Sequence, residues 1–191
     1  RSYDGSLKDF DFVFTGGLHK SHTDLRYLVK KEIFKDQYID CKSNKGISAF
    51  LKSNLLKDKF SKLNIFWAEW GSKNFYFKSM LPKGKKYAKL MSRSKVFLNT
   101  PSAIGIFNTR FFELMASKTL ILCPKVPEGY EFLIDGYNCI MFEPDCTNFF
   151  DTLSRAVHDD EYRKKIVDNA YKDLQDHTYD KRIKFLLDTV K

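Results

Sequence analysis

Apolar and polar residues follow two different periods along this chain, and the two kinds of segment alternate almost from end to end. Short runs rich in β-branched and aromatic residues predict strands over residues 10–15, 38–41, 63–70, 95–99, 119–123 and 138–142. Segments with apolar residues three and four positions apart predict helices over 21–34, 47–60, 87–91, 109–116, 147–157, 159–174 and 179–190. Alternation of this kind is typical of βαβ units.

The pattern therefore predicts an α/β protein. We expect a doubly wound, Rossmann-like parallel sheet with helices on both faces and a helical C-terminal tail. The 191 residues suit one domain with its own core, and we find neither an internal repeat nor a linker, so we predict a single unit over 1–191. Sheets of this class bind ligands at the carboxyl ends of their strands, which makes the residues just after each strand the first candidates for a site.

Composition and charge narrow the class of protein. Hydrophobic residues make up 43% of the chain and charged residues 30%, which argues against disorder. No run approaches the roughly 20 consecutive apolar residues that span a bilayer. The 33 basic and 24 acidic residues leave a net charge of +9, which predicts an anionic partner (nucleic acid, a membrane surface or a phosphorylated small molecule) or simply a solvated basic surface.

The four cysteines and the start of the chain bear on its setting. Cys41, Cys123, Cys139 and Cys146 form no CxxC pair, so we expect no metal site and interpret them as buried thiols in a reducing, cytoplasmic compartment. The chain begins with Arg1 and has no signal-peptide pattern. We therefore expect it to be part of a longer protein.

The first candidate motif leaves the first predicted strand. It contains Gly16 and Gly17, followed by His19 and Lys20 as charged partners. Glycine lets the backbone approach a ligand closely, and the N–H groups at a helix start attract phosphate. The spacing is neither GxGxxG nor GxxxxGK[ST], so dinucleotide and P-loop motifs are excluded. The alternative is an ordinary βα turn.

The second candidate lies at the start of the helix predicted over 109–116. Asn108 suits an N-cap, while Arg110 and Glu113 stand three residues apart on one helical face. In a functional interpretation, Glu113 accepts hydrogen bonds from ligand hydroxyls and Arg110 faces an anionic group. Spacing alone favours the other interpretation, a surface ion pair on a capped helix.

The third candidate is the loop after the strand predicted over 119–123, which includes Glu128, Gly129 and Tyr130. One interpretation is a Pro/Gly loop that opens a short helix. In the other, its backbone N–H groups meet a sugar or a phosphate.

The second half of the chain carries a family resemblance. The strings YAKLMSRSKVFLN, FNTRFFELMASKTLILCPKVPEGYEFLIDGYNCIMFEPD and HTYDKRIKFLL occur in this order. This series resembles the nucleotide-sugar-binding lobe of GT-B glycosyltransferases, and most closely the spore-maturation-protein-like branch of the group 1 enzymes. The likeness covers residues 63–191 well and 10–60 as a first βα pair.

The resemblance implies an enzyme that transfers a sugar, of hexosyl type and without a metal ion, to an acceptor such as a glycan or a protein. The donor would be UDP-, GDP- or dTDP-linked, and no other cofactor is expected. In such enzymes the position of Glu113 receives the ribose hydroxyls. Arg110 would meet the diphosphate, and Asn108 would cap the helix that faces it.

The same resemblance assigns the remaining candidate residues. The turn at the end of the first strand would face the diphosphate, through Gly16, Gly17, His19 and Lys20. The segment 77–82, with Ser79, would hold the nucleobase. The loop with Glu128, Gly129 and Tyr130 would border the donor sugar.

One position departs from the family pattern. Group 1 retaining enzymes often carry two glutamates separated by seven residues, and the first of these positions is Gly105 here. This fits the spore-maturation-protein-like branch. It also leaves open a degenerate lobe kept as a scaffold, and a basic Rossmann-like module that binds nucleic acid is a further, less favoured alternative.

The partners expected from the resemblance are a nucleotide-sugar and an acceptor-binding lobe, located upstream or on another chain. Peripheral contact with a membrane is compatible with the basic charge.

Overall fold

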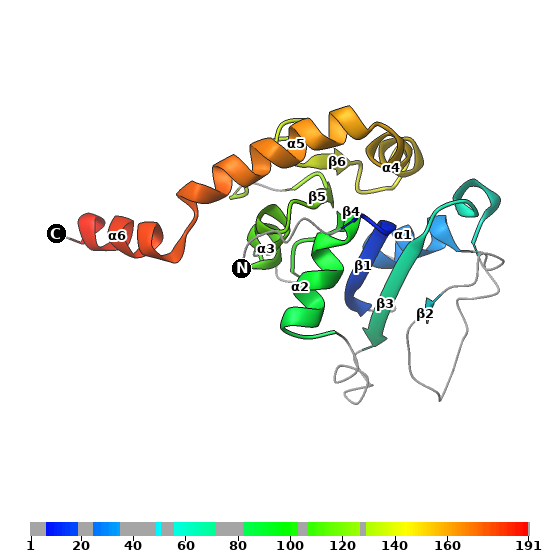
Figure 1. Cartoon of the computed structure of the whole chain (residues 1–191), viewed down its shortest axis with the longest axis horizontal. Helices are drawn as coiled ribbons and strands as arrows, with labels where there is room; N and C mark the ends of the chain where they lie inside the picture. Colours follow the sequence, from blue (N-terminus) through cyan, green and yellow to red (C-terminus); the bar gives the residue numbers. More distant parts are fainter. Residues whose placement is uncertain are drawn as a thin grey trace.

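The structure, a computed structural model, describes residues 7–18, 25–34, 49–50, 56–71, 82–102, 107–126 and 129–190. Its strands form one sheet in the order β2-β3-β1-β4-β5-β6, with β2 antiparallel to β3 and all other pairs parallel (Figure 1). The strands are β1 (Phe10–Leu18), β2 (Ala49–Phe50), β3 (Ile65–Gly71), β4 (Ser94–Leu98), β5 (Leu120–Pro124) and β6 (Ile140–Phe142). The predicted parallel α/β sheet is confirmed.

Helices follow the strands as the apolar spacing predicts. They are α1 (Leu25–Ile33), α2 (Lys85–Ser92), α3 (Arg110–Ala116), α4 (Phe149–His158), α5 (Asp160–Asp173) and α6 (Tyr179–Thr189). The last three start with polar caps or acidic first turns, and the Asp159 side chain caps α5 by accepting from the Tyr162 N–H. The residues predicted as a strand over 38–41 lie outside the described residues.

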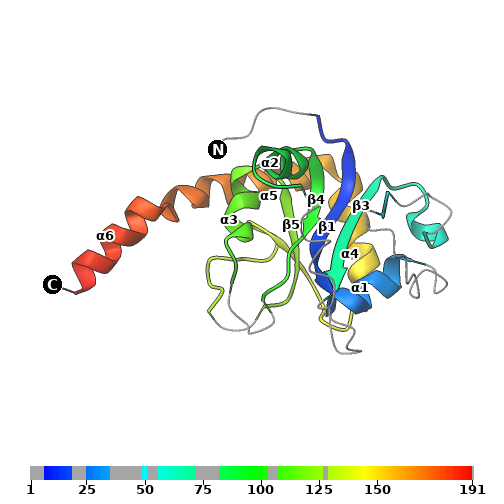
Figure 2. The same ribbon diagram turned by 90° about the horizontal axis from the view of Figure 1, so that it is seen from below.

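The sheet has an apolar core on each face, because alternate residues of a strand point to opposite sides. On one face Phe12 and Phe14 of β1 pack with buried residues of α1 and α4. On the other face Val13 packs with buried residues of α2 and α3. Helix α5 contributes to both cores. Figures 1 and 2 show the helices on the two sides of the sheet.

The prediction of one helix over 47–60 is wrong. The chain instead forms β2, whose Ala49 and Phe50 pair with Trp67 and Phe66 of β3, and later a short 3-10 helix at 58–60. Short apolar runs fit a strand and a helix equally well by periodicity. Here the free edge of β3 favours the strand, because pairing with Ala49 and Phe50 satisfies backbone hydrogen-bonding groups that an edge strand leaves exposed.

The order of the strands leaves a switch point between β1 and β4. β3 and β4 lie on opposite sides of β1, so the chain reverses its direction of travel across the sheet after β3. Ligands of open α/β sheets bind at such a reversal, outside the carboxyl ends of the strands. The ladder between β1 and β4 ends at the pair Phe14 and Leu98, whereas β1 stays paired with β3 as far as Leu18. Beyond that pair, therefore, β1 and β4 no longer bind each other.

The last helix extends away from the rest of the chain. Figures 1 and 2 show α6 projecting from the end of α5 with only its first turns near the sheet layers. None of its residues is buried. Its exposed apolar residues are Tyr179, Ile183, Phe185, Leu186 and Leu187, followed by Val190. No described helix is long and apolar enough to cross a membrane.

Candidate functional site

Arg110 links α3 to the end of β1. The guanidinium donates a hydrogen bond from Nη1 to the carbonyl oxygen of Thr15, at 2.7 Å, and lies 5.8 Å from the centre of the Tyr87 ring. Thr15 Oγ1 lies 2.9 Å from the Tyr87 hydroxyl, so the three side chains and one backbone carbonyl form a connected group. Arg110 and Tyr87 each belong to the first turn of a helix. The group therefore stands at the carboxyl edge of the sheet, beside the switch point between β1 and β4.

The electrostatics of Tyr87 reflect this environment. Burial raises the pKa of the Tyr87 hydroxyl above its usual value, and the charge of Glu113 adds to the rise. The charge of Arg110 and the hydrogen bond with Thr15 lower the same pKa, although burial outweighs them. Tyr87 is thus a neutral hydrogen-bonding group that lies within electrostatic reach of both Arg110 and Glu113.

Glu113 lies one helical turn after Arg110, and its side chain is exposed. Among the described residues, neither an ion pair nor a hydrogen bond joins its carboxylate to Arg110. The surface ion pair that spacing alone favours is therefore wrong. Arg110 bonds to Thr15 instead, because β1 brings an unpaired carbonyl within reach of its guanidinium.

Asn108 does not cap α3. The N-cap of α3 is Thr109, without a side-chain cap bond. The amide of Asn108 donates from Nδ2 to the carbonyl of Thr100 at 3.0 Å and accepts from Asn99 Nδ2 at 3.2 Å. The predicted cap is therefore wrong: the side chain turns back to the strand, because the end of β4 offers it both a donor and an acceptor. Asn108 ties the approach to α3 to the end of β4.

The glycine pair of the first motif lies at the end of β1, and packing accounts for Gly16. A Cβ atom on Gly16 would lie 2.7 Å from Cζ of the buried Phe14 ring, a contact too short for real side chains. Gly17 contributes its carbonyl oxygen to a hydrogen bond from Arg26. His19 and Lys20 lie outside the described residues. Their proposed contact with a diphosphate stays a prediction.

The loop after β5 retains one exposed candidate residue. Gly129 has φ of 94° and is exposed, but its N–H already bonds to Glu131 Oε1 at 2.9 Å. Tyr130 is buried, and its ring packs against Phe111 and Phe132. Its aromatic ring is therefore part of the core and does not line an open cleft.

Glu128, in the same loop, and Ser79, in the segment predicted to hold the nucleobase, lie outside the described residues. Their predicted contacts with a donor are untested.

Three residues of this edge escape prediction from the sequence. Arg26 in the first turn of α1 donates three hydrogen bonds to the ends of β1 and β4. Tyr87 and Asn99 complete the groups around Arg110 and Asn108. Their common signal is position, since each stands where a strand ends or a helix starts at the carboxyl edge. That signal is shared by many residues without a role.

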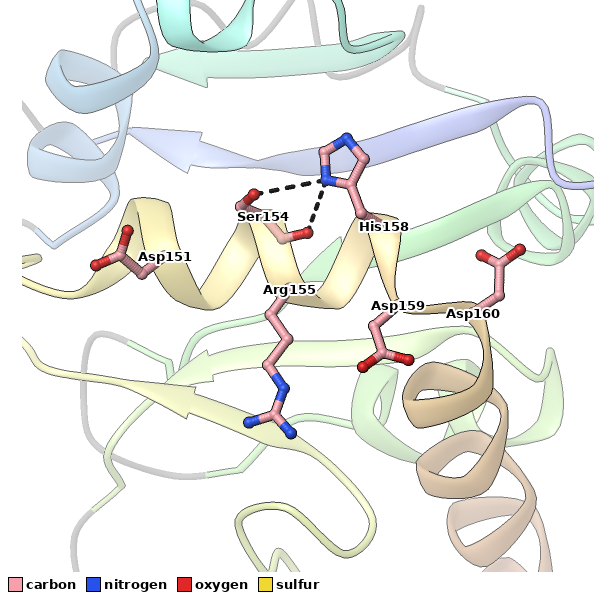
Figure 3. Close-up of a pocket in the computed structure, with 6 residues that line it drawn as sticks. All are labelled: Asp151, Ser154, Arg155, His158, Asp159 and Asp160. Atoms are coloured by element: carbon pink, nitrogen blue, oxygen red, sulfur yellow. Dashed lines mark hydrogen bonds between the residues drawn. The ribbon is translucent and has the colours of Figure 1, made fainter.

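A shallow hollow of about 630 Å³ lies elsewhere, along α4 and its turn into α5 (Figure 3). Figure 3 shows α4 running opposite to the strands, so that His158 and Asp160 lie toward the amino edge. Two of its polar groups have local partners: His158 Nδ1 lies 2.8 Å from Ser154 O, and Asp160 pairs with Arg163. The hollow lies along α4 and the start of α5 and is separate from the group formed by Arg110, Tyr87 and Thr15.

The described part of the chain contains no group of three or more His, Cys, Asp or Glu side chains arranged to hold a metal ion. Cys123, Cys139 and Cys146 are buried and free. Burial raises the pKa of the Cys146 thiol to about 11. These thiols are therefore part of the core.

Comparison with known proteins identifies the family. A family model described as "Glycosyl transferase-like" matches residues 47–188. The chain belongs to this family. The match includes β3, β4, α3 and the helices that follow, so the glycosyl transferase-like region carries Arg110 and Glu113. The family and the fold support a transferase. No curated protein matches the chain.

Solved structures of glycosyltransferases share the fold. A variant of TarM from S. aureus, bound to Fondaparinux, alpha-GlcNAc-glycerol and UDP, is 11% identical with a TM-score of 0.62, covering 98% of this chain and 37% of that one. The pneumococcal O-GlcNAc transferase GtfA, with UDP and GlcNAc, is 13% identical with a TM-score of 0.59, covering 99% and 37%. A variant of the T4 phage enzyme BGT, with UDP-glucose, is 13% identical with a TM-score of 0.57, covering 93% and 46%.

At these identities the likeness concerns the fold. The sheet and its covering helices match the Rossmann-like lobes of GT-B glycosyltransferases, as the sequence resemblance predicts. The chain spans less than half the length of these three proteins.

Proposed function

We propose that this chain is the donor-binding lobe of a glycosyltransferase and holds the nucleoside diphosphate of a nucleotide-sugar at the carboxyl ends of β1 and β4. One observation carries the proposal: Arg110 and the exposed Glu113 stand on one helix at the carboxyl edge of the sheet, with Arg110 fixed on β1 by its bond to Thr15 O. A cation and a carboxylate one turn apart match a ligand with phosphate oxygens at one end and hydroxyls at the other.

Each side chain has a separate task in this proposal. When a glycosidic bond to the diphosphate breaks, negative charge grows on the departing phosphate oxygens. Arg110 supplies fixed positive charge there, since the N–H groups of its guanidinium outnumber its single bond to Thr15 O. Glu113 accepts hydrogen bonds from the two ribose hydroxyls and so orients the nucleotide. We propose transfer of a hexosyl group without a metal ion, with Arg110 meeting the charge of the diphosphate.

The donor base is proposed to be uracil, with GDP- and dTDP-sugars as the alternatives. The solved structures of TarM, GtfA and BGT compared above contain UDP or UDP-glucose, which supports this order. We also propose the spore-maturation-protein-like branch, supported by Gly105 at the position of the first family glutamate.

The acceptor is proposed to bind on a second lobe, upstream in the same protein or on another chain. The three relatives extend well beyond the matched region, which supports a further lobe. The exposed apolar residues of α6 are compatible with a covering partner. We propose a cytoplasmic location and, from the net charge of +9, peripheral contact with an anionic membrane.

Titration calorimetry of the chain with UDP, GDP and dTDP tests the proposed function. We expect one of the three to bind with a measurable heat, and UDP to bind tightest. Sugar transfer by this chain alone should be weak or absent, because the acceptor lobe is missing from the assay. A folded sample that binds none of the three would contradict donor binding and favour a degenerate lobe.

A further inference from the structure

Arg26 forms hydrogen bonds on both sides of the switch point between β1 and β4. From the first turn of α1, its Nη1 donates to the carbonyl oxygen of Gly17 at 2.8 Å. On the other side, its Nε donates to Thr100 Oγ1 at 2.7 Å and its Nη2 donates to the carbonyl oxygen of Pro101 at 3.2 Å. One guanidinium therefore joins the end of β1 to Thr100 and Pro101, which are the second and third residues after the end of β4.

The bridge occurs where the sheet itself no longer joins these strands. The β1–β4 ladder ends at the pair Phe14 and Leu98, and Gly17 is paired only with Trp70 of β3 among the described strands. Up to this pair, main-chain hydrogen bonds hold β1 and β4 together. After it, the Arg26 side chain supplies the hydrogen bonds that connect the end of β1 to the residues that follow β4.

The two segments that Arg26 joins also accept hydrogen bonds from two of the candidate donor-binding residues. Arg110 is fixed on β1 through Thr15 O, two residues before Gly17. Asn108, at the approach to α3, is fixed on the other segment through the carbonyl of Thr100. The separation between the two segments therefore sets where the Arg110 guanidinium, held on β1, lies relative to the Asn108 amide, held on Thr100.

We propose that Arg26 is a positioning residue that holds the carboxyl ends of β1 and β4 at the separation required for diphosphate binding. The inference rests on the proposed function. Small errors in the placement of binding groups strongly reduce the affinity for a ligand that they bind together. If these groups are already held in place before the ligand binds, no free energy is spent on ordering them. In this role the Arg26 guanidinium donates its hydrogen bonds to protein acceptors and acts on the ligand only through them.

Arginine suits this role better than lysine. Three acceptors on two segments require N–H groups that point in different directions from one rigid group. A planar guanidinium provides them. A lysine ammonium is a single point at the end of a flexible chain, so it would reach one segment while leaving the other unheld. The conservative change Arg26→Lys should therefore fail to restore the frame.

The test measures UDP affinity by calorimetry for Arg26→Lys, Arg26→Met and Arg26→Ala, at a temperature where circular dichroism shows each to be folded. We expect the dissociation constant to rise about tenfold in all three, as for the loss of a few hydrogen bonds. Methylguanidinium added to Arg26→Ala should restore affinity in part, because it fills the vacated site. If the Arg26→Ala variant bound UDP weakly only because it is less stable, methylguanidinium would not restore the affinity, since this cation resembles a denaturant.

Arg163→Met is the matched control. Arg163 Nη1 donates to the carbonyls of Ala156 and Val157, at 3.0 and 2.8 Å, so it too is an arginine bonded to two backbone oxygens. It joins α4 to α5, away from the carboxyl edge. We expect a lower melting temperature with an unchanged dissociation constant for UDP. If Arg26→Met binds UDP like the unmodified chain, the positioning role is wrong.

Amide hydrogen exchange in the ligand-free protein separates this inference from the proposed function. Arg26→Met should exchange faster at residues 16–18 and 99–102, while the centre of the sheet is unchanged. If the unmodified chain binds none of UDP, GDP and dTDP, the proposed function fails. Unchanged exchange in the two segments would then overturn the role of Arg26 by itself.

Discussion

Replacement of Arg110 by methionine is expected to raise the dissociation constant for UDP by roughly 10- to 100-fold, since hydrogen bonds to charged groups contribute about 1.5–3 kcal/mol. Methionine keeps the apolar length of the side chain but removes all of the guanidinium donors. The same change leaves the carbonyl of Thr15 without its bond from Nη1. We therefore also expect the free energy of unfolding to fall by about 1–3 kcal/mol, measured by urea denaturation.

Arg110→Lys separates the two tasks of this side chain. Lysine restores the positive charge, but its N–H groups all lie on one nitrogen, so it serves Thr15 O and a diphosphate less well than the spread donors of a guanidinium. Its UDP affinity should lie between those of the unmodified chain and Arg110→Met. An Arg110→Met protein that is less stable but binds UDP normally would show that Arg110 only braces β1.

Replacement of Glu113 by alanine is expected to weaken UDP binding by about tenfold or more with little change in stability. The carboxylate is exposed and lies one turn from Arg110, so the folded protein loses no buried partner. Exposed substitutions of this kind usually change the free energy of unfolding by less than about 0.5 kcal/mol. A carboxylate that accepts two ribose hydroxyls contributes more to binding than that, because both bonds are charge-assisted.

A deoxynucleotide makes the test of Glu113 specific to ribose. If Glu113 binds the hydroxyls, the unmodified chain should prefer UDP to 2′-deoxy-UDP, and Glu113→Ala should reduce this preference. Glu131→Ala is the control, because the Glu131 carboxylate accepts from the N–H of Gly129 in the loop after β5. Equal losses in the two alanine variants would remove Glu113 from the ribose role.

The framework of the sheet could be predicted from the sequence because its strands are short, apolar and separated by well-patterned helices. The runs that became β4 and β5 are buried almost throughout, as is the centre of β1, and such runs leave few alternatives to a parallel sheet. The helix predicted over 47–60 is wrong because a contact with a distant part of the chain determines the structure there. Its apolar spacing fits a helix, but Ala49 and Phe50 pair with the edge of β3, which the local pattern does not encode.

The candidate site could be predicted in its location but not in its contacts. Spacing places Arg110 and Glu113 on one face of α3, and the topology brings that face to the carboxyl edge. The partner of Arg110 is a carbonyl of β1, 95 positions earlier in the chain. Arg26 likewise bonds to Thr100, 74 positions later in the chain and just after β4. Only the folded arrangement of β1 and β4 determines such contacts.

The most direct measurement is a crystal structure of the chain soaked with a mixture of UDP, GDP and dTDP. The account predicts one nucleoside diphosphate at the carboxyl ends of β1 and β4, with its phosphates bonded to Arg110 and its ribose hydroxyls to Glu113. A nucleotide bound in the hollow along α4, or bound at the carboxyl edge without contact to either side chain, would contradict it.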